Sequence, residues 1–252
     1  MDRLLHLSLN AIKHSKEDSS IRSNNLANVN VPGFRKDIEP PMIESSFLKT
    51  LESFETRAFS LREGKNRFDD NQGRLDYTEN EKDVAINGSG YFLMMPENNE
   101  PALSRRGDFR VDQDGFLVDG AGNKILNQGL QPIVLPPYRQ LVIGNDGRIT
   151  IEPLDGEPGQ RDEIGFIGTI QAEVKDLKKS GDGNIRFIDN RDIQPDQLAE
   201  IAQGYLETSN VNPTEELVEM LHRQRHYELN VRLMSIAREL DESGASIMRL
   251  PR

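Results

Sequence analysis

The chain has 252 residues, of which 35% are hydrophobic and 6% aromatic, and a mean hydropathy of −0.63 leaves little apolar side chain to spare for a core. Its formal net charge of −11 argues against a nucleic-acid binder and against docking on anionic membranes, because both need a positive field. The absence of cysteine excludes disulfides and cysteine-ligated metals.

Residues 3–30 have the periodicity of a helix. Apolar and small side chains recur at the spacing of one helix face: Leu5, Leu9, Ile12, Ser19, Ser23 and Leu26. Residues 13–20 are entirely polar, so this helix alone would be marginal in water. Pro32 and Gly33 predict its end, because proline disfavours helix at the preceding residue and glycine accepts a turn.

Neither a leader nor a membrane span is expected. Residues 1–7 lack the continuous apolar region and the small-residue cleavage site of a Sec signal peptide. No stretch approaches the ~18 uninterrupted apolar residues that a membrane helix needs. If the protein leaves the cytoplasm, another route must carry it.

Residues 34–75 carry Pro40 and Pro41, many charges and no clean period. They are interpreted as an extended connector with one possible short helix near 43–54.

Residues 76–205 have the pattern of an all-β domain. Asn87-Gly88 lies between two apolar runs, 83–86 and 90–94, and predicts a hairpin there. Gly/Asp turns separate further short strands, which are expected at 109–112, 116–119, 141–143, 149–151, 164–167 and 185–188.

A second helix is expected from about residue 213 to the end of the chain. Asn212 is a plausible N-cap, and Pro213 suits the first helical turn. Some 35 helical residues would span ~50 Å. Two apolar stripes lie on nearly opposite sides: Leu217, Met220, Gln224, Tyr227, Val231 and Met234 form one, and Leu229, Leu233, Ile236, Leu240 and Ile247 form the other. Since one partner helix cannot cover both, the helix either kinks back onto its own domain or packs on both sides inside a wall or tube of helices.

Motifs with catalytic or ligand-binding chemistry are weak. His222 and His226 have i, i+4 spacing, but Arg223 and Arg225 beside them oppose a metal, so a solvated or intersubunit polar face is the better interpretation. No Ser/His/Asp set is evident in the sequence. A structural protein without cofactor or metal is therefore predicted rather than an enzyme, with a hydrolase kept as an alternative.

Two glycine-containing turns resemble ligand-binding loops only superficially. Asp112-x-Asp114-Gly115 resembles the start of a calcium loop, but glycine comes too early and strand residues follow, so a hairpin turn is expected. Gly120-Ala121-Gly122 lacks the third glycine and the strand–helix context of a phosphate loop.

Asparagine gathers where each helix meets the rest of the chain. Residues 23–30 contain four Asn near a helix end, and 209–212 contain two near a helix start. Asn suits caps and turns because its amide competes for backbone groups. Capping alone does not need so many asparagines, and buried side-chain amides could also form hydrogen bonds between chains.

These stretches resemble the signatures of flagellar basal-body rod and hook proteins. The N-terminal signature corresponds to residues 23–29 and 32–35, the middle domain to 83–92, 106–109 and 114–115, and the C-terminal signature to 209–212, 216–218 and 224–230. Residues 73–78, 233–234 and 240–246 are most similar to proximal-rod members. Distal-rod members are the alternative, but they carry a glycine-rich connector, which residues 36–72 do not resemble.

The resemblance implies an α+β fold. Residues 1–33 and 206–252 would form a discontinuous, coiled-coil-like assembly domain, 34–75 a connector and 76–205 a β-rich outer domain. It further implies export through the flagellar type III apparatus, assembly into the periplasmic rod and transmission of torque from motor to hook. Its partners would be further copies and other rod proteins, with the basal-body rings and the export gate as further candidates. A hook-type axial protein and a secreted adhesin-like β module stay open.

The assembly interface is expected along both terminal helices and their asparagine-rich ends. The candidate residues are Leu5, Leu9, Ile12, Asn24, Asn25, Leu26, Asn28, Asn210, Asn212, Leu217, Met220, Gln224, Tyr227, Val231, Leu233, Met234, Ile236 and Leu240.

Overall fold

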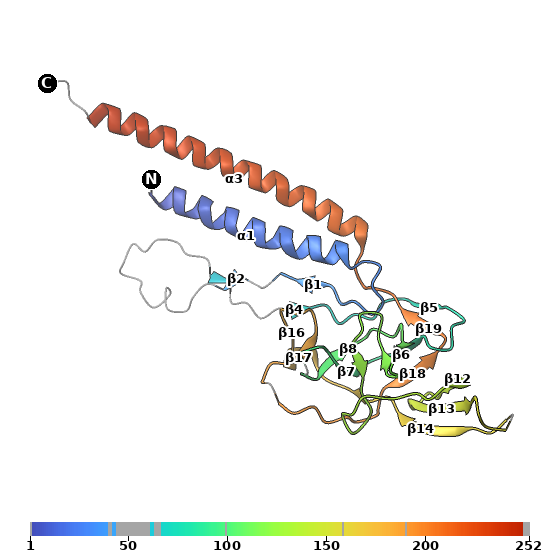
Figure 1. The fold of residues 1–252 in the computed structure, drawn as a ribbon. Coiled ribbons are helices and arrows are strands. Elements are labelled where there is room, and N and C mark those ends of the chain that lie inside the picture. The colour runs from blue at the N-terminus through green and yellow to red at the C-terminus, as the bar shows by residue number, and fades with distance from the viewer. Residues whose placement is uncertain are drawn as a thin grey trace. The chain divides into compact units, whose positions relative to one another are not determined.

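The computed structural model describes residues 2–39, 42–43, 61–62, 67–98, 100–157, 159–189 and 191–248. It has an α+β fold, as predicted, and divides into two compact units (Figure 1). The helical unit comprises residues 1–27, 37–66 and 212–252, and the β unit comprises 28–36 and 67–211.

The helical unit consists mainly of two long helices. Helix α1 (Asp2–Ala27) and helix α3 (Pro213–Met248) lie side by side and run antiparallel (Figure 1). Strand β1 (Asp37–Ile38) contacts α1, and β2 (Met42–Ile43) pairs with β3 (Leu61–Arg62). Both predicted helices are confirmed, and α3 reaches 36 residues. Of the short helix predicted near 43–54, residue 43 is strand and the rest lies outside the described residues.

Helix α3 begins where its sequence predicts. The Asn212 Oδ1 atom accepts hydrogen bonds from the backbone N–H groups of Thr214 (3.1 Å) and Glu215 (3.3 Å), which would otherwise lack partners in the first turn. Asn212 is therefore the N-cap.

The β unit is built from short strands, with one 3-10 turn (Val174–Asp176) among them. Its strands are β4 (Arg67–Phe68), β5 (Leu75–Tyr77), β6 (Val84–Asn87), β7 (Tyr91–Met95), β8 (Ala102–Ser104), β9 (Arg110–Val111), β10 (Leu117–Val118), β11 (Lys124–Ile125), β12 (Tyr138–Ile143), β13 (Arg148–Pro153), β14 (Asp162–Phe166), β15 (Thr169–Ile170), β16 (Leu177–Lys179), β17 (Ile185–Phe187), β18 (Glu200–Gln203) and β19 (Tyr205–Glu207).

The largest sheet has the order β16-β17-β8-β7-β11-β10-β9, and β15 also pairs with β7. Strands β12, β13 and β14 form a three-stranded sheet, and β6–β18 and β5–β19 form two ribbons. The pairs β9–β10 and β12–β13 confirm two predicted hairpins, and β17, which pairs with β16, confirms the strand predicted at 185–188. In the first, the Asp112 Oδ1 atom accepts hydrogen bonds from the N–H groups of Asp114 and Phe116 and closes the turn, so the hairpin turn expected there is confirmed.

The hairpin predicted at Asn87-Gly88 is wrong. Strand β6 pairs with β18, more than a hundred residues later, whereas β7 pairs with β8, β11 and β15. Gly88 and Gly90 both have positive φ angles (87° and 128°), so the chain turns there, but it turns from one sheet into another. The local turn chemistry was identified correctly, and the partner strand was not.

The β unit encloses an apolar core in two clusters. One centres on Phe92 and Phe109, whose rings meet edge to face at 5.4 Å. The other centres on Tyr91, Leu93 and Leu103. Because β7 residues alternate between the two clusters, this strand separates them.

Candidate assembly surfaces

The face on which α1 and α3 meet is polar. On α1 the buried side chains of this face are Ser8, Ser15, Asp18 and Asn25. Ala11 and Arg22 are half-buried and lie between them, so that successive positions of the face are three or four residues apart. On α3 the matching positions are Glu216, Met220, Arg223, Asn230, Met234 and Ala237. We call these twelve residues the seam. Its spacing is that of a heptad, but few of its residues are apolar.

An ionic cluster lies within the seam. Arg22 donates to Glu216 (3.1 and 3.2 Å), and Arg223 pairs with Asp18 (3.2 Å). Glu39 accepts from both arginines at 2.9 Å and thereby links the two pairs. The Glu216 side chain is 0% exposed and that of Asp18 is 1% exposed, so the arginines compensate charges that are buried.

The surroundings of Arg22 favour its charged form. Burial lowers the pKa of Arg22, but hydrogen bonds and charge from Glu39 and Glu216 outweigh burial and hold that pKa above its ordinary value. Arg22 therefore stays positively charged throughout the physiological pH range.

The asparagines at the end of α1 bond within the chain. The Asn25 amide exchanges two hydrogen bonds with the Asp37 backbone, and Asn24 donates to the Asp37 carboxylate at 2.7 Å. Asn25 is fully buried, Asn28 is half-buried and Asn24 is exposed. These bonds fix the segment after α1 against the helix.

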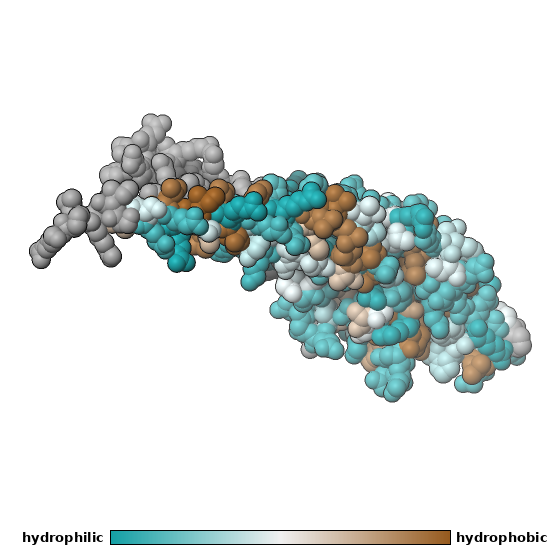
Figure 2. Space-filling model, turned by 90° about the horizontal axis from the view of Figure 1, so that it is seen from above, coloured by the Kyte–Doolittle hydropathy of each residue, from teal (hydrophilic) through white to brown (hydrophobic). Residues whose placement is uncertain are grey.

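A row of aliphatic side chains on α3 points away from the seam. Leu229, Leu233, Ile236 and Leu240 are 46–53% exposed and recur at steps of four and three. We call these four residues the outer stripe. Figure 2 shows hydrophobic side chains gathered on the exposed surface of the helical unit. In an ordinary amphipathic helix that packed only on α1, the apolar stripe would face α1 and the polar side chains would face solvent. Here the polar seam faces α1 and the outer stripe faces solvent, so the usual arrangement is reversed.

The remaining predicted residues of α3 divide between the two surfaces. Met220 and Met234 lie half-buried in the seam, whereas Leu217, Gln224, Tyr227 and Val231 are exposed. On α1, Leu9 is exposed, Ile12 and Leu26 are half-buried, and the Leu5 side chain lies outside the described residues.

A buried charge cluster also occurs inside the β unit. The Glu207 carboxylate accepts hydrogen bonds from Arg35, from Arg105 (3.2 Å) and from the Gly73 N–H group (2.9 Å), and its backbone carbonyl accepts from Gly33 (2.7 Å). All three charged side chains are at most 2% exposed. Burial lowers the pKa of Arg105, although Glu207 acts in the opposite direction.

Asn210 joins the same region. Its side chain accepts from the Lys36 N–H group (2.7 Å) and donates to the carbonyls of Asp69 and Asn71 (2.9 Å each), and its own N–H donates to Phe34. The segments that follow α1 and precede α3 are therefore hydrogen-bonded to one another within the β unit.

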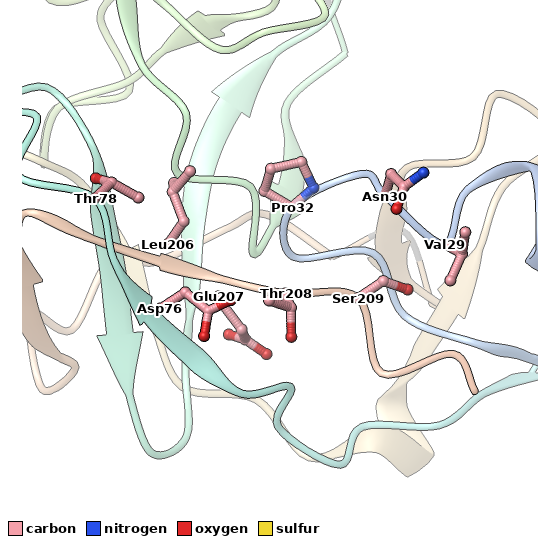
Figure 3. Close-up of a pocket in the computed structure, with 9 residues that line it drawn as sticks. All are labelled: Val29, Asn30, Pro32, Asp76, Thr78, Leu206, Glu207, Thr208 and Ser209. Carbon is pink, nitrogen blue, oxygen red and sulfur yellow. The ribbon is translucent and has the colours of Figure 1, made fainter. Parts of the chain in front are cut away.

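A pocket of about 260 Å³ opens beside these segments (Figure 3). Its lining consists of Val29, Asn30, Pro32, Asp76, Thr78, Leu206, Glu207, Thr208 and Ser209. The titratable side chains among these are already engaged, since Glu207 binds two arginines and Asp76 accepts from Arg74 at 2.9 Å. The lining therefore offers no acid–base pair for catalysis.

The described part of the chain holds no group of three or more residues arranged to bind a metal. His222 and His226 are both exposed on α3. Among the helices that the structure describes, none combines the length and apolarity needed to cross a bilayer.

The polar seam and both ionic clusters escaped the sequence interpretation. Asp18, Arg22, Glu207 and Arg223 carried no predicted role, because isolated charges in helices and strands are usually solvated. A heptad spacing of small and charged residues at 8, 11, 15, 18, 22 and 25 was the available signal.

Comparison with known proteins gives matches in two regions and over the full chain. Residues 85–151 match the family described as the flagellar hook protein FlgE/F/G D1 domain, and residues 202–247 match flagellar basal body rod FlgEFG protein C-terminal. The chain is 30% identical over 247 residues to the flagellar basal-body rod protein FlgF of Caulobacter vibrioides, covering 97% of each.

Two further relatives align over a similar share of the chain. The chain is 32% identical over 246 residues to the flagellar basal-body rod protein FlgG of Buchnera aphidicola subsp. Schizaphis graminum, covering 90% of this chain and 92% of that one. It is 25% identical to FlgF of Salmonella typhimurium, covering 93% and 94%.

Proposed function

Because the chain belongs to the flagellar basal-body rod protein family, we propose that it is a structural subunit of the rod that assembles through its terminal helices. The observation that carries this proposal is the reversed polarity of the helical unit. Charged residues occupy the seam, and the outer stripe faces solvent. Covering such a regular row of aliphatic side chains with other helices is favourable, because it removes apolar surface from water.

The assembly domain would comprise residues 1–33 and 206–252, with 34–75 as connector and 76–205 outside. In the assembly, α1 and α3 would pack against helices of neighbouring subunits in a coiled-coil-like tube. The heptad spacing of the seam supports this geometry. We further propose that the tube transmits torque from motor to hook and that flagellum-dependent motility requires it.

We place the subunit in the proximal rod. The alignment with FlgF over 97% of both chains supports this position, as does the single glycine between residues 36 and 72. Full-length similarity to FlgG supports the alternative of a distal-rod position. Partners would be further copies and other rod proteins, with the basal-body rings and export gate as additional contacts. Export would use the flagellar type III system, and the role is non-enzymatic.

The proposal is tested by placing a charge in the outer stripe. We expect Leu240→Glu to abolish rod assembly and swimming while leaving the isolated chain folded. Motility on soft agar and electron microscopy of basal bodies provide the measurements. The matched control is Leu154→Glu in the β unit, because the two leucines are 53% and 51% exposed.

The control decides between assembly and a general defect. If Leu154→Glu stops motility as completely as Leu240→Glu, added charge alone accounts for the loss. Normal motility of Leu240→Glu would overturn the proposal.

A further inference from the structure

We infer that the ionic cluster of the seam sets the register of α1 against α3, and with it the level along α1 at which the outer stripe lies. This inference concerns the single folded chain and does not require that the chain assembles.

The contacts define the present register. The Ser15 hydroxyl donates to the Arg223 carbonyl (3.3 Å), and Arg22 binds Glu216. The residue numbers of both pairs add up to 238, as opposed positions in two antiparallel helices of equal rise must. By the same rule Ser8 lies at the level of Asn230.

Outside the cluster, little in the seam specifies this register. Its other members are small or flexible, such as Ser8, Ala11, Met234 and Ala237. Small side chains leave shallow ridges, and methionine adapts to many environments. Because the seam repeats every seven residues, sliding α3 by one heptad would exchange seam positions for seam positions.

The cluster opposes sliding in both directions. In one direction Arg22 would face Arg223, which places two cations together. In the other direction Arg223 would face Ser8, and Asp18 would reach Pro213 at the start of α3, so the pair between Asp18 and Arg223 would be broken. Buried charges without partners are strongly unfavourable, and the setting of helix register is the best-supported role of polar groups in such seams.

Glu39 adds a third point of attachment. It lies outside both helices and accepts from Arg22 and Arg223 together. It can do so only while the two arginines lie close to one another, so it opposes the slip that would carry Arg223 to the level of Ser8 and away from Arg22.

The test uses engineered cysteines, since the natural chain has none. Ser8→Cys with Asn230→Cys reports the observed register, and Ser8→Cys with Ala237→Cys reports the register slipped by one heptad. Position 237 lies seven residues beyond 230, or ~10 Å along the helix, beyond the ~7 Å Cα separation that a disulfide tolerates. Cross-linking is followed at low concentration, so that only intrachain bonds form.

In the natural background we expect the 8–230 pair to close at least about tenfold faster than the 8–237 pair. In an apolar variant, which combines Asp18→Leu, Arg22→Met, Glu216→Leu and Arg223→Met, the two rates should come within about threefold of each other. Unchanged selectivity in a variant of normal helicity would overturn the inference.

A second variant guards against simple misfolding. It inverts every charge of the cluster through Asp18→Arg, Arg22→Glu, Glu39→Arg, Glu216→Arg and Arg223→Glu. Because each attraction and each repulsion is preserved, the preference for the 8–230 pair should return. Failure to return would also overturn the inference. Since cross-linking is measured on monomers, neither result depends on rod assembly.

Discussion

The helical unit and the β unit distribute polarity in opposite ways. The β unit packs apolar side chains inside and carries 26 acidic against 17 basic residues, a net −9 of the total −11. The helical unit buries Asp18 and Glu216 in the seam and leaves the outer stripe in solvent. A unit that has buried its apolar surface is complete, whereas one that exposes it gains stability from neighbours. The following predictions test this contrast.

The largest effect is expected from Glu207→Ala in the β unit. It would leave Arg35 and Arg105 buried without their carboxylate, which costs about 3–5 kcal/mol of unfolding free energy. Urea unfolding followed by circular dichroism measures this loss. Glu163→Ala is the control, because its pair with Arg148 is half exposed and should contribute no more than about 1 kcal/mol. Equal losses for the two variants would contradict the prediction.

Matched leucine truncations compare the two units directly. Leu103 is 1% exposed and Leu233 is 46% exposed. Leu103→Ala should reduce the unfolding free energy by about 2–5 kcal/mol, because it leaves a cavity. Leu233→Ala should change that of the isolated chain by about 0.5 kcal/mol or less. A large loss from Leu233→Ala in verified monomer would mean that the outer stripe is already covered within the chain.

A smaller effect is expected at the start of α3. Asn212→Ala removes the acceptor for the Thr214 and Glu215 N–H groups and should cost about 1 kcal/mol of helix stability. Far-ultraviolet circular dichroism during thermal unfolding measures the change. Gln224→Ala, at an exposed position inside the helix, should leave helicity unchanged or raise it slightly. An equal loss of helicity from both substitutions would contradict the capping role of Asn212.

The smallest effect concerns acid pH. A hydrogen bond from Arg186 lowers the pKa of Asp182 to about 2. Since the folded-state pKa lies below the unfolded value of about 3.9, the stabilisation is present above that value and is lost as pH falls toward 2. The side chain is partly exposed, so we expect less than about 1 kcal/mol.

The measurement for Asp182 compares urea midpoints at pH 5 and at pH 2.5. Asp182→Asn should lower the midpoint at pH 5 and have less effect at pH 2.5. An equal decrease at both pH values would assign the effect to packing rather than to charge.

Local signals in the sequence predicted much of the fold. Both helices, the Asn212 cap and the turn at Asp114 follow from residue chemistry within a few positions. The pairing of β6 with β18 did not follow, because strand partners distant in sequence are chosen by burial of the whole sheet. Asn87-Gly88 provided a turn without specifying what it joins.

The candidate surfaces were predicted only on their apolar side. The stripes of α3 were readable because leucine at helical spacing is a strong pattern. The seam was not, because Asp18, Arg22 and Glu216 look like solvated charges until a partner helix is placed against them. Burial of a charge depends on tertiary context, which a single sequence does not contain.

The hydrogen bonds from Gly33 to Glu207 and from Asn210 to Phe34 have a consequence for modularity. They tie the segment 28–36 to the last residues of the β unit, although residues 37–66, which lie between the two parts of that unit in the chain, belong to the helical unit. An exchange of the β unit for another cassette must therefore replace residues 28–36 together with 67–211, while the sequence of both helices stays the same.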